Sequence, residues 1–523
     1  VARAMAAYTA GDHVLAARLC ADGLHAYARA AGREDLLWLR GLARAGLGPD
    51  DSFDQAIAIR PKFALALFCR ALMRDLAGEP DRALADYDEA IRVSPRFATA
   101  YANRGNMKLR KGDQAAALAD YEEALRIEPR HAVALVNRGY VRSLRKDHDG
   151  ALADFTAAIE SNPGCVDAYG NRADSWREKG DLDKALADCE AALALKPGDT
   201  KALVNRGSVR EKKGDLPGAL ADFEAAIRSD PRDAVALGGR ARVHMARGEL
   251  EKALVDLDRS VECDPAFGPS YYNRGSVHVR LGDIAKAKAD YTAAIDRDPS
   301  IFDAWYNRGA LRGQQGEFDG ALSDLDEALR LQPASAMALA SRGGVKAMKG
   351  DVLAAMADLD EALRVDPSWV EAWRNRAIVR SQTGDMKGAL ADCDEAVKRA
   401  PDNMEALVTR GMFRANTGDN AGALADLDVV LAKDARNLIA LIYRGNAKAG
   451  LNDVRGALVD YEAACAVAPD SPEANADRGM ALLALGERDE ARKSLEKALQ
   501  VAPAGWALRD EIEKSLAELR RPR

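Results

Sequence analysis

The 523-residue sequence is poor in several features that mark particular classes of protein. It has no run of 18 or more apolar residues, which excludes a transmembrane helix of ordinary length. Acidic residues outnumber basic ones by 82 to 75, so the chain lacks the basic field of a nucleic-acid binder. Its 7 cysteines include no C-x-x-C pair, which argues against a disulfide framework or a zinc cluster. We therefore expect reduced thiols and a cytoplasmic location.

Catalytic motifs are missing as well. The sequence has no Gly-rich loop with Lys-Ser/Thr for phosphates, no G-x-S-x-G and no H-E-x-x-H. Cys20, Cys189 and Cys393 occupy apolar places in a helical pattern, where we expect core side chains. His244 and His278 stand 34 residues apart without a third metal ligand. We predict that the chain is not an enzyme and that it holds no cofactor and no metal.

A strict repeat is the dominant feature that is present. Prolines recur every 34 residues, with Ala435 replacing the one expected between Pro401 and Pro469. The series is Pro61, Pro95, Pro129, Pro163, Pro197, Pro231, Pro265, Pro299, Pro333, Pro367, Pro401, Pro469 and Pro503. A spacing of 34 residues that is kept over more than 440 residues indicates a stacked array of similar units rather than separate globular domains. Thirteen complete units start at Ala64 and run to residue 505, and we number the places within each unit from 1 to 34.

Each unit is predicted to be a pair of helices. In residues 98–131 apolar residues recur at helical spacing on both sides of a Gly112-Asp113 turn. Glycine, or Lys146 or Asn452, fills that place 15, and an acid follows at place 16 in all 13 units. We expect the left-handed conformation at place 15 to end the first helix and the acid to cap the second. The proline at place 32 then ends the second helix.

Small residues explain how such pairs would pack. Alanine fills place 20 in all 13 units and place 27 in all but two, and place 8 is always Gly or Ala. Larger residues stand at places 4 and 24. This pattern resembles the tetratricopeptide repeat (TPR) family over nearly the whole chain, with one departure: place 7, usually apolar in the family, is always Arg.

The resemblance implies an all-α fold, a right-handed α-solenoid superhelix of about 15 helix-turn-helix units, 13 of them well formed. Residues 1–33 read as an incomplete unit and residues 34–63 as a shortened one, ahead of the 13 units in 64–505. Residues 506–523 are predicted to form a capping helix, with Trp506, Leu508, Ile512, Leu516 and Leu519 on its apolar face. Val1 is not a methionine and lies within a helical pattern, so we expect a longer parent chain but a natural C-terminus.

The arginine at place 7 is matched by Asp at place 23 in 12 of 13 units. Antiparallel helices joined at places 15 and 16 bring these two places opposite each other, which predicts a recurring, partly buried Arg–Asp pair. The alternative is a line of arginines that is offered to an anionic ligand. A second basic residue often stands at place 11, and we expect acids of neighbouring helices to neutralise it.

The resemblance also implies a groove that is lined by the first helices, with places 2, 5, 6, 9, 12 and 13 facing it. Place 6 carries a series of asparagines, which we take as candidate peptide-binding residues: Asn103, Asn137, Asn171, Asn205, Asn273, Asn307 and Asn375. Amides donate and accept, so a ladder of them could hold a peptide backbone. The alternative is that they bond only to neighbouring helices or water.

Other groove residues suggest what a ligand would meet. Leu65, Phe68 and Leu72 at one end, and Ile442, Tyr443 and Met480 at the other, are candidate apolar contacts. The middle of the groove is more acidic, which favours polar or basic ligand segments. No basic clamp for a terminal carboxylate accompanies the ladder.

The predicted function is a non-catalytic scaffold that binds a protein or an extended peptide in the groove. The alternative is a regulatory or substrate-recruiting arm of a larger enzyme or complex. Nucleic acid and membrane are not expected partners, because acids line the groove and no membrane segment is present. Self-association is compatible with the pattern but is not predicted.

Overall fold

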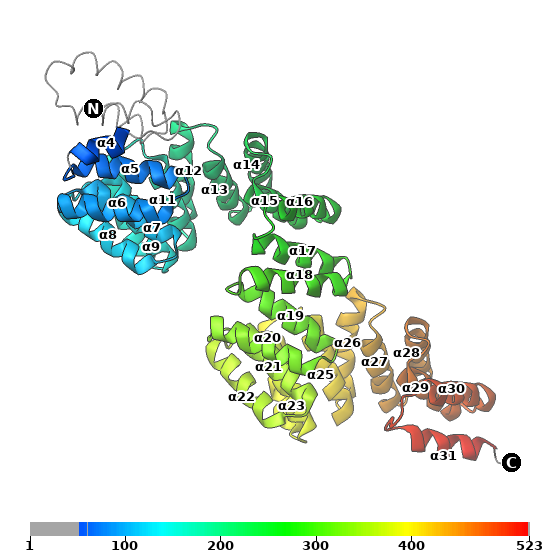
Figure 1. Cartoon of the computed structure of the whole chain (residues 1–523). Coiled ribbons are helices and arrows are strands. Elements are labelled where there is room, and N and C mark those ends of the chain that lie inside the picture. Colours follow the sequence, from blue (N-terminus) through cyan, green and yellow to red (C-terminus); the bar gives the residue numbers. More distant parts are fainter. Residues whose placement is uncertain (1–51, 60, 521–523) are drawn as a thin grey trace. The chain divides into compact units, whose positions relative to one another are not determined.

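The computed structural model describes residues 52–59 and 61–520, and these form helices joined by short turns, without a strand. The predicted N-terminal units, 1–33 and most of 34–63, lie outside the described residues apart from α4 (Ser52–Ile59). The chain divides between Pro265 and Ala266 into two compact units. We call them the N-unit (α4–α16) and the C-unit (α17–α31) and describe each by itself (Figure 1). The all-α solenoid expected from the repeat is confirmed.

Every 34-residue repeat contributes one antiparallel helix pair. The first helices are α5 (Ala64–Leu76), α7 (Ala98–Arg110), α9 (Ala132–Leu144), α11 (Val166–Glu178), α13 (Thr200–Lys212), α15 (Ala234–Ala246), α17 (Gly268–Arg280), α19 (Phe302–Gln314), α21 (Ala336–Lys349), α23 (Val370–Gln382), α25 (Met404–Thr417), α27 (Leu438–Gly450) and α29 (Pro472–Ala484). The second helices are α6 (Pro80–Val93), α8 (Gln114–Ile127), α10 (His148–Ser161), α12 (Leu182–Leu195), α14 (Leu216–Ser229), α16 (Leu250–Cys263), α18 (Ile284–Arg297), α20 (Phe318–Leu331), α22 (Val352–Val365), α24 (Met386–Arg399), α26 (Asn420–Lys433), α28 (Val454–Val467) and α30 (Arg488–Val501). The first helices of consecutive repeats also contact each other from α7 to α15 in the N-unit and from α19 to α29 in the C-unit, so they form a continuous face in each unit.

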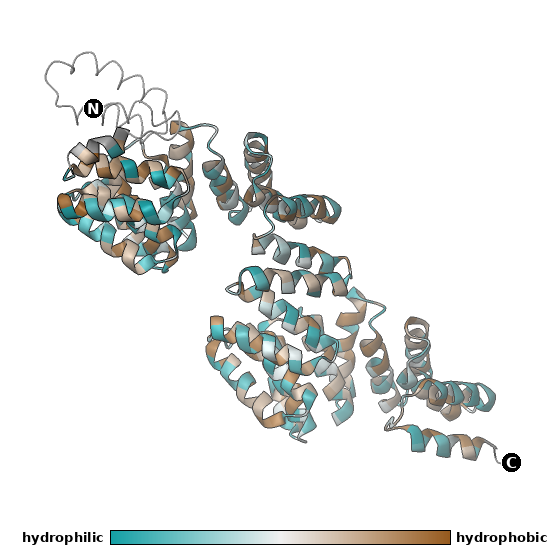
Figure 2. Ribbon diagram, viewed as in Figure 1, coloured by the Kyte–Doolittle hydropathy of each residue, from teal (hydrophilic) through white to brown (hydrophobic). Residues whose placement is uncertain are grey.

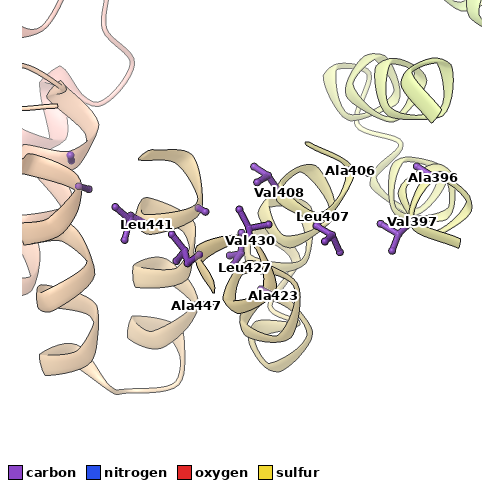
Figure 3. Close-up of a cluster of buried hydrophobic side chains, with 14 residues drawn as sticks. Ala396, Val397, Ala406, Leu407, Val408, Ala423, Leu427, Val430, Leu441 and Ala447 are labelled. Carbon is purple, nitrogen blue, oxygen red and sulfur yellow. The ribbon is translucent and has the colours of Figure 1, made fainter. Parts of the chain in front are cut away.

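The core is built from the small and large places that the repeat keeps. Ala423 and Leu427 of α26 are fully buried between α25 and α27, beside Leu407 and Leu441 (Figure 3). The glycines at place 8 allow the closest approach, since a Cβ on Gly105 would lie 2.7 Å from Tyr121 Cε1. Both hydrophobic and hydrophilic residues occur along the helices (Figure 2), as expected for helices that are buried on one side only.

The turn at place 15 has the left-handed conformation in every complete repeat. Glycine takes a positive φ at eleven of these positions, and the two other residues do the same, Lys146 with φ 64° and Asn452 with φ 65°. The acid at place 16 was expected to cap the second helix in every repeat, and this is correct only for aspartate. Asp113, for example, accepts a hydrogen bond from the Ala116 amide.

The glutamates at place 16 do not form the expected cap. Glu79, Glu249, Glu317 and Glu487 make no side-chain cap bond. Their longer side chains reach instead toward basic neighbours, as Glu79 does toward Arg82 and Glu317 toward Lys288. The extra methylene thus replaces a backbone contact by a side-chain ion pair.

The C-terminal helix α31 (Arg509–Arg520) covers the end of the last repeat. Ile512 and Leu516 are buried against Leu495 and Ala498, with Trp506 and Leu519 partly buried beside them. Leu508, which was expected on the same face, precedes the helix and keeps 36% of its surface exposed. The buried stripe closes the apolar end of the array, as a capping helix must.

Replacing Lys146 by glycine is expected to stabilise the α9–α10 pair by about 0.5–1 kcal/mol. A side chain in the left-handed region costs about 1–2 kcal/mol, and glycine removes this cost but loses more backbone entropy on folding, which offsets part of the gain. The gain would appear as slower amide hydrogen exchange in α9 and α10. Arg145→Gly is the matched control, since the preceding residue has φ −85° and its replacement should destabilise the pair. If both variants changed the exchange rates equally, the left-handed conformation of Lys146 would carry no backbone strain.

Candidate binding surface

The arginines at place 7 are engaged inside the repeat array. Arg342 donates from Nε and Nη2 to the Asp358 carboxylate at 2.8 and 2.7 Å, within its own helix pair. Its Nη1 donates at 2.7 Å to Asp326 of the preceding pair. Hydrogen bonding to Asp358 is the main cause that raises the pKa of Arg342, and burial opposes it. Arg104, Arg376, Arg410 and Arg444 join two repeats in the same way, whereas Arg138, Arg206 and Arg240 bond to the Asp of their own pair. These bonds favour the structural interpretation over a line of arginines that is free to bind an anionic ligand.

The second basic residue, at place 11, neutralises the same aspartate rather than a separate acid. Lys346 Nζ lies 2.7 Å from Asp358 Oδ2, so this one carboxylate takes two cations. Arginine repeats the arrangement at Arg74, Arg142, Arg210, Arg312, Arg380 and Arg414. His244 and His278 stand at the same place, with Nε2 3.8 and 3.7 Å from Asp256 and Asp290. Among the described residues no cluster of three or more candidate metal ligands occurs.

Several ladder asparagines bond to the preceding first helix. Asn205 Nδ2 donates to Asp174 Oδ2 and to the Gly170 carbonyl, both at 3.1 Å. Asn137 Nδ2 donates to Asn106 Oδ1 at 2.6 Å. Place 6 of one repeat thus lies against places 5 and 9 of the repeat before it. These amides tie consecutive first helices together.

The other ladder members have different surroundings. Asn375 donates to the Ala340 carbonyl at 3.3 Å, and Asn103 donates to Thr99 of its own helix. Asn171 accepts from Lys201 Nζ at 2.8 Å, while Asn273 is buried. Asn307 lies close to the hydroxyls of Tyr272 and Tyr291. All seven lie on the first helices, and all except Asn273 keep part of their surface exposed.

A cavity of about 460 Å³ opens on the first helices of the C-unit. It spans three consecutive repeats, on α19, α21 and α23, and includes the ladder residue Asn375. Its lining is Tyr306, Ala310, Gly313, Gln314, Ala340, Ser341, Gly344, Val345, Ala347, Met348, Trp369, Glu371, Arg374, Asn375, Ile378 and Gln382. All but Val345 and Trp369 stand at places 2, 5, 6, 9, 12 or 13, which we call the inner face.

The cavity exists because side chains are missing from its floor. Places 9 and 12 are both Gly or Ala in only two of the 13 repeats, at Ala310 with Gly313 and at Gly344 with Ala347. These two repeats are adjacent, so the small residues of α19 and α21 form a single hollow. The sequence reasoning missed this cavity, although the consecutive small residues at two inner-face places were a readable signal.

Polar groups at the cavity are incompletely satisfied. The Nε of Arg374 is buried without a hydrogen-bond partner among the described residues, although Nη2 lies 3.4 Å from Glu405. Ser341 Oγ donates to the Tyr306 hydroxyl at 3.2 Å across the floor. A buried donor without a partner costs about 1–3 kcal/mol, so an acceptor that reached Arg374 would be stabilised there.

Carboxylates occupy the start of the inner face in several repeats. Place 2 is Asp303, Glu371, Glu405 and Glu473 in four of the seven repeats of the C-unit. Burial raises the pKa of Asp303. Further along the same unit, burial and then the charge of Glu473 raise the pKa of Asp477 to about 7. Among the described residues, Glu405 has Arg374 as an ion-pair partner, whereas Asp303, Glu371 and Glu473 have none.

The apolar groove candidates differ in how far they are buried. Phe68 belongs to the core rather than to a binding surface, since it is buried and its ring lies 5.8 Å from Tyr87 and 5.0 Å from Phe97. Leu65, Leu72, Ile442 and Tyr443 are partly buried against core clusters. Met480 is exposed. Place 5 therefore faces the adjoining helices at Phe68, where a bulky ring fills the seam.

The surroundings of the buried cysteines disfavour the reactive thiolate form. Burial raises the pKa of the Cys189 and Cys393 thiols to about 12, so both stay protonated near neutral pH. Cys165, Cys189, Cys263, Cys393 and Cys465 form no disulfide. Among the described helices, none has both the length and the apolar character needed to cross a membrane.

Family models identify the repeat. A model described as tetratricopeptide repeat matches residues 77–132, 145–200, 272–336, 311–368, 349–404 and 442–506. A second model with the same description matches residues 174–243. Among curated proteins, none matches the sequence. The segments matched by the first model together cover more than half of the chain.

Three solved structures are similar to parts of the chain. The APC/C heterotetramer Cut9–Hcn1 has 15% identity and a TM-score of 0.47, and the match covers 80% of this chain and 97% of that one. YrrB, a TPR protein with an unusual peptide-binding site, has 26% identity, a TM-score of 0.32 and coverage of 35% and 95%. A tetratricopeptide repeat protein from Parabacteroides merdae ATCC 43184 has 18% identity, a TM-score of 0.38 and coverage of 49% and 99%.

Proposed function

The chain belongs to the tetratricopeptide repeat family, whose helix pairs typically serve as protein-interaction scaffolds, and from this we propose that it binds an extended peptide or protein segment on its inner face. The binding is non-catalytic and uses the asparagine ladder in part. The cytoplasmic location expected from seven cysteines without a C-x-x-C pair is part of the same proposal. The observation that carries the proposal is the cavity, because its lining consists almost entirely of inner-face places of three successive repeats.

Energetics favour many contacts over one. A net hydrogen bond contributes about 0.5–1.5 kcal/mol, whereas association costs roughly 4–15 kcal/mol in lost freedom. Asn137 and Asn205 each have an amide proton engaged within the array, yet each side chain has further donor or acceptor capacity. Several such rungs within one unit, together with apolar contacts beside them, supply what a micromolar complex needs, about −8 kcal/mol.

The variant Asn137→Ala/Asn171→Ala/Asn205→Ala tests the ladder. We expect affinity capture followed by mass spectrometry to recover roughly tenfold less of each partner, or lower still, than the unaltered chain recovers. The reason is that three hydrogen-bonding side chains are lost, at about 0.5–1.5 kcal/mol each. The control is Asp81→Ala/Asp149→Ala/Asp183→Ala, which removes three exposed acids of second helices in the same unit. Equal recovery by both variants would reject the ladder. Because Asn137 and Asn205 also tie helices together, hydrogen exchange of α9–α13 must match the unaltered chain.

A further inference from the structure

The cavity on α19, α21 and α23 is distinct in character from the rest of the inner face. Its floor is formed by Ala310, Gly313, Gly344 and Ala347, while Tyr306 and Trp369 supply aromatic wall. About 460 Å³ lies within the range of pockets that bury a ligand group rather than only solvent, roughly 300–1,000 Å³. The hollow is large enough for a large side chain together with the main chain beside it.

The charges at this cavity indicate the sign of its ligand. Glu371 lines the cavity and Asp303 stands one turn before Tyr306 on α19, and neither has an ion-pair partner among the described residues. Arg374 is the one cation of the lining, and it is already close to Glu405. The nearby lysines are likewise engaged, since Lys346 pairs with Asp358 and Lys349 with Asp319. The carboxylates therefore exceed the cations available to them.

We propose that the cavity is a specificity site for an extended peptide segment with an aromatic side chain that is flanked by lysine or arginine. This rests on the proposed function and names the class of segment. The aromatic ring enters the hollow between α19 and α21, and the basic residue lies against Glu371, which lines the cavity.

The alternative chemistries fit less well. An acidic segment would meet Glu371, and Arg374, the one cation of the lining, is already close to Glu405. A segment with small side chains would leave the hollow unfilled, and the apolar floor would then contribute no burial energy. An aromatic residue beside a cation satisfies the floor, the walls and the excess carboxylates together.

Selection of short random peptides on the immobilised full chain tests this site. We expect the enriched sequences to share an aromatic residue next to Lys or Arg. Ala347→Leu, which fills the hollow with a good helix former, should weaken binding of an enriched synthetic peptide by roughly ten- to a hundredfold, the loss expected for one large apolar side chain. Ala449→Leu is the matched control, since Ala449 is also partly buried at place 12 but lies outside the cavity. Glu371→Gln should weaken binding several-fold and reduce its dependence on salt.

The outcomes separate this site from the general proposal. If no peptide is enriched, both the proposed function and the site are rejected. If peptides are enriched but bind Ala347→Leu as tightly as the unaltered chain, peptide binding stands and the cavity is not its site. Enrichment of acidic or non-aromatic sequences also overturns the proposal. Should hydrogen exchange show that Ala347→Leu perturbs α21, Ala310→Leu fills the same hollow from α19 and takes its place, judged by the same outcomes.

Discussion

Asp324→Ala is expected to destabilise its helix pair by about 3–5 kcal/mol, the usual cost of removing one partner of a buried ion pair. The Asp324 side chain is only 2% exposed and accepts from Arg308 Nε and Nη2 at 2.9 and 2.7 Å. Arg312 Nη1 donates to the same carboxylate at 2.8 Å. Removing the carboxylate leaves two guanidinium groups close together, one of them 9% exposed, with no counter-charge.

Arg308→Ala should cost less than Asp324→Ala, because Asp324 keeps Arg312 as a partner. Asp319→Ala is the surface control, since its side chain is 89% exposed and pairs with Lys349, so its loss should stay within about 0.5 kcal/mol. Long arrays do not unfold as one cooperative unit, and the comparison is therefore made by native-state hydrogen exchange in α19 and α20. An Asp324→Ala effect no larger than that of Asp319→Ala would show that the pair carries no such energy.

The charge network illustrates what could be predicted from sequence. Places 7 and 23 were predicted to face each other because two antiparallel helices about a known turn leave no other register. Arg206 and Asp222 confirm it, with Nη2 and Oδ1 2.6 Å apart. The place-11 residue was expected to meet an acid, but that it shares the same carboxylate follows from side-chain reach, which spacing alone does not give. Arg210 lies 2.8 Å from Asp222 for this reason.

The candidate site was harder to predict, because it depends on what neighbouring repeats lack. A periodic pattern emphasises recurring residues such as the place-6 asparagines, whereas the cavity arises where two adjacent repeats both carry small residues at places 9 and 12. Phe68 was misplaced for the opposite reason, because its side chain is large. Its place faces the groove in the family pattern, yet packing against Tyr87 and Phe97 puts the ring in the core. Both outcomes are decided by volumes contributed from several helices at once.

The pH dependence of the last repeats is expected to change when Asp477 is replaced by asparagine. Burial first, and then the charge of Glu473, raise the pKa of Asp477 to about 7 from its ordinary value of 3.8. The folded state therefore binds more protons than the unfolded state between these two values, and stability falls as pH rises through that window. The contribution is fully present below pH 3.8 and is lost by about pH 7.

Asp477→Asn should remove that slope, so that above pH 7 the variant is more stable than the unaltered chain, by about 4 kcal/mol at most. Tyr443 of α27 and Tyr461 and Cys465 of α28 also lie within the influence of this charge, but burial raises the pKa of each, so they stay neutral across the window. The measurement is hydrogen exchange of α27–α30 at a series of pH values, corrected for intrinsic exchange. Glu473→Gln is the matched variant: it removes the second cause of the shift only, and should move the midpoint to lower pH while keeping the slope. Parallel pH profiles for Asp477→Asn and the unaltered chain would mean that Asp477 is ionised in the folded protein, with its charge solvated or paired.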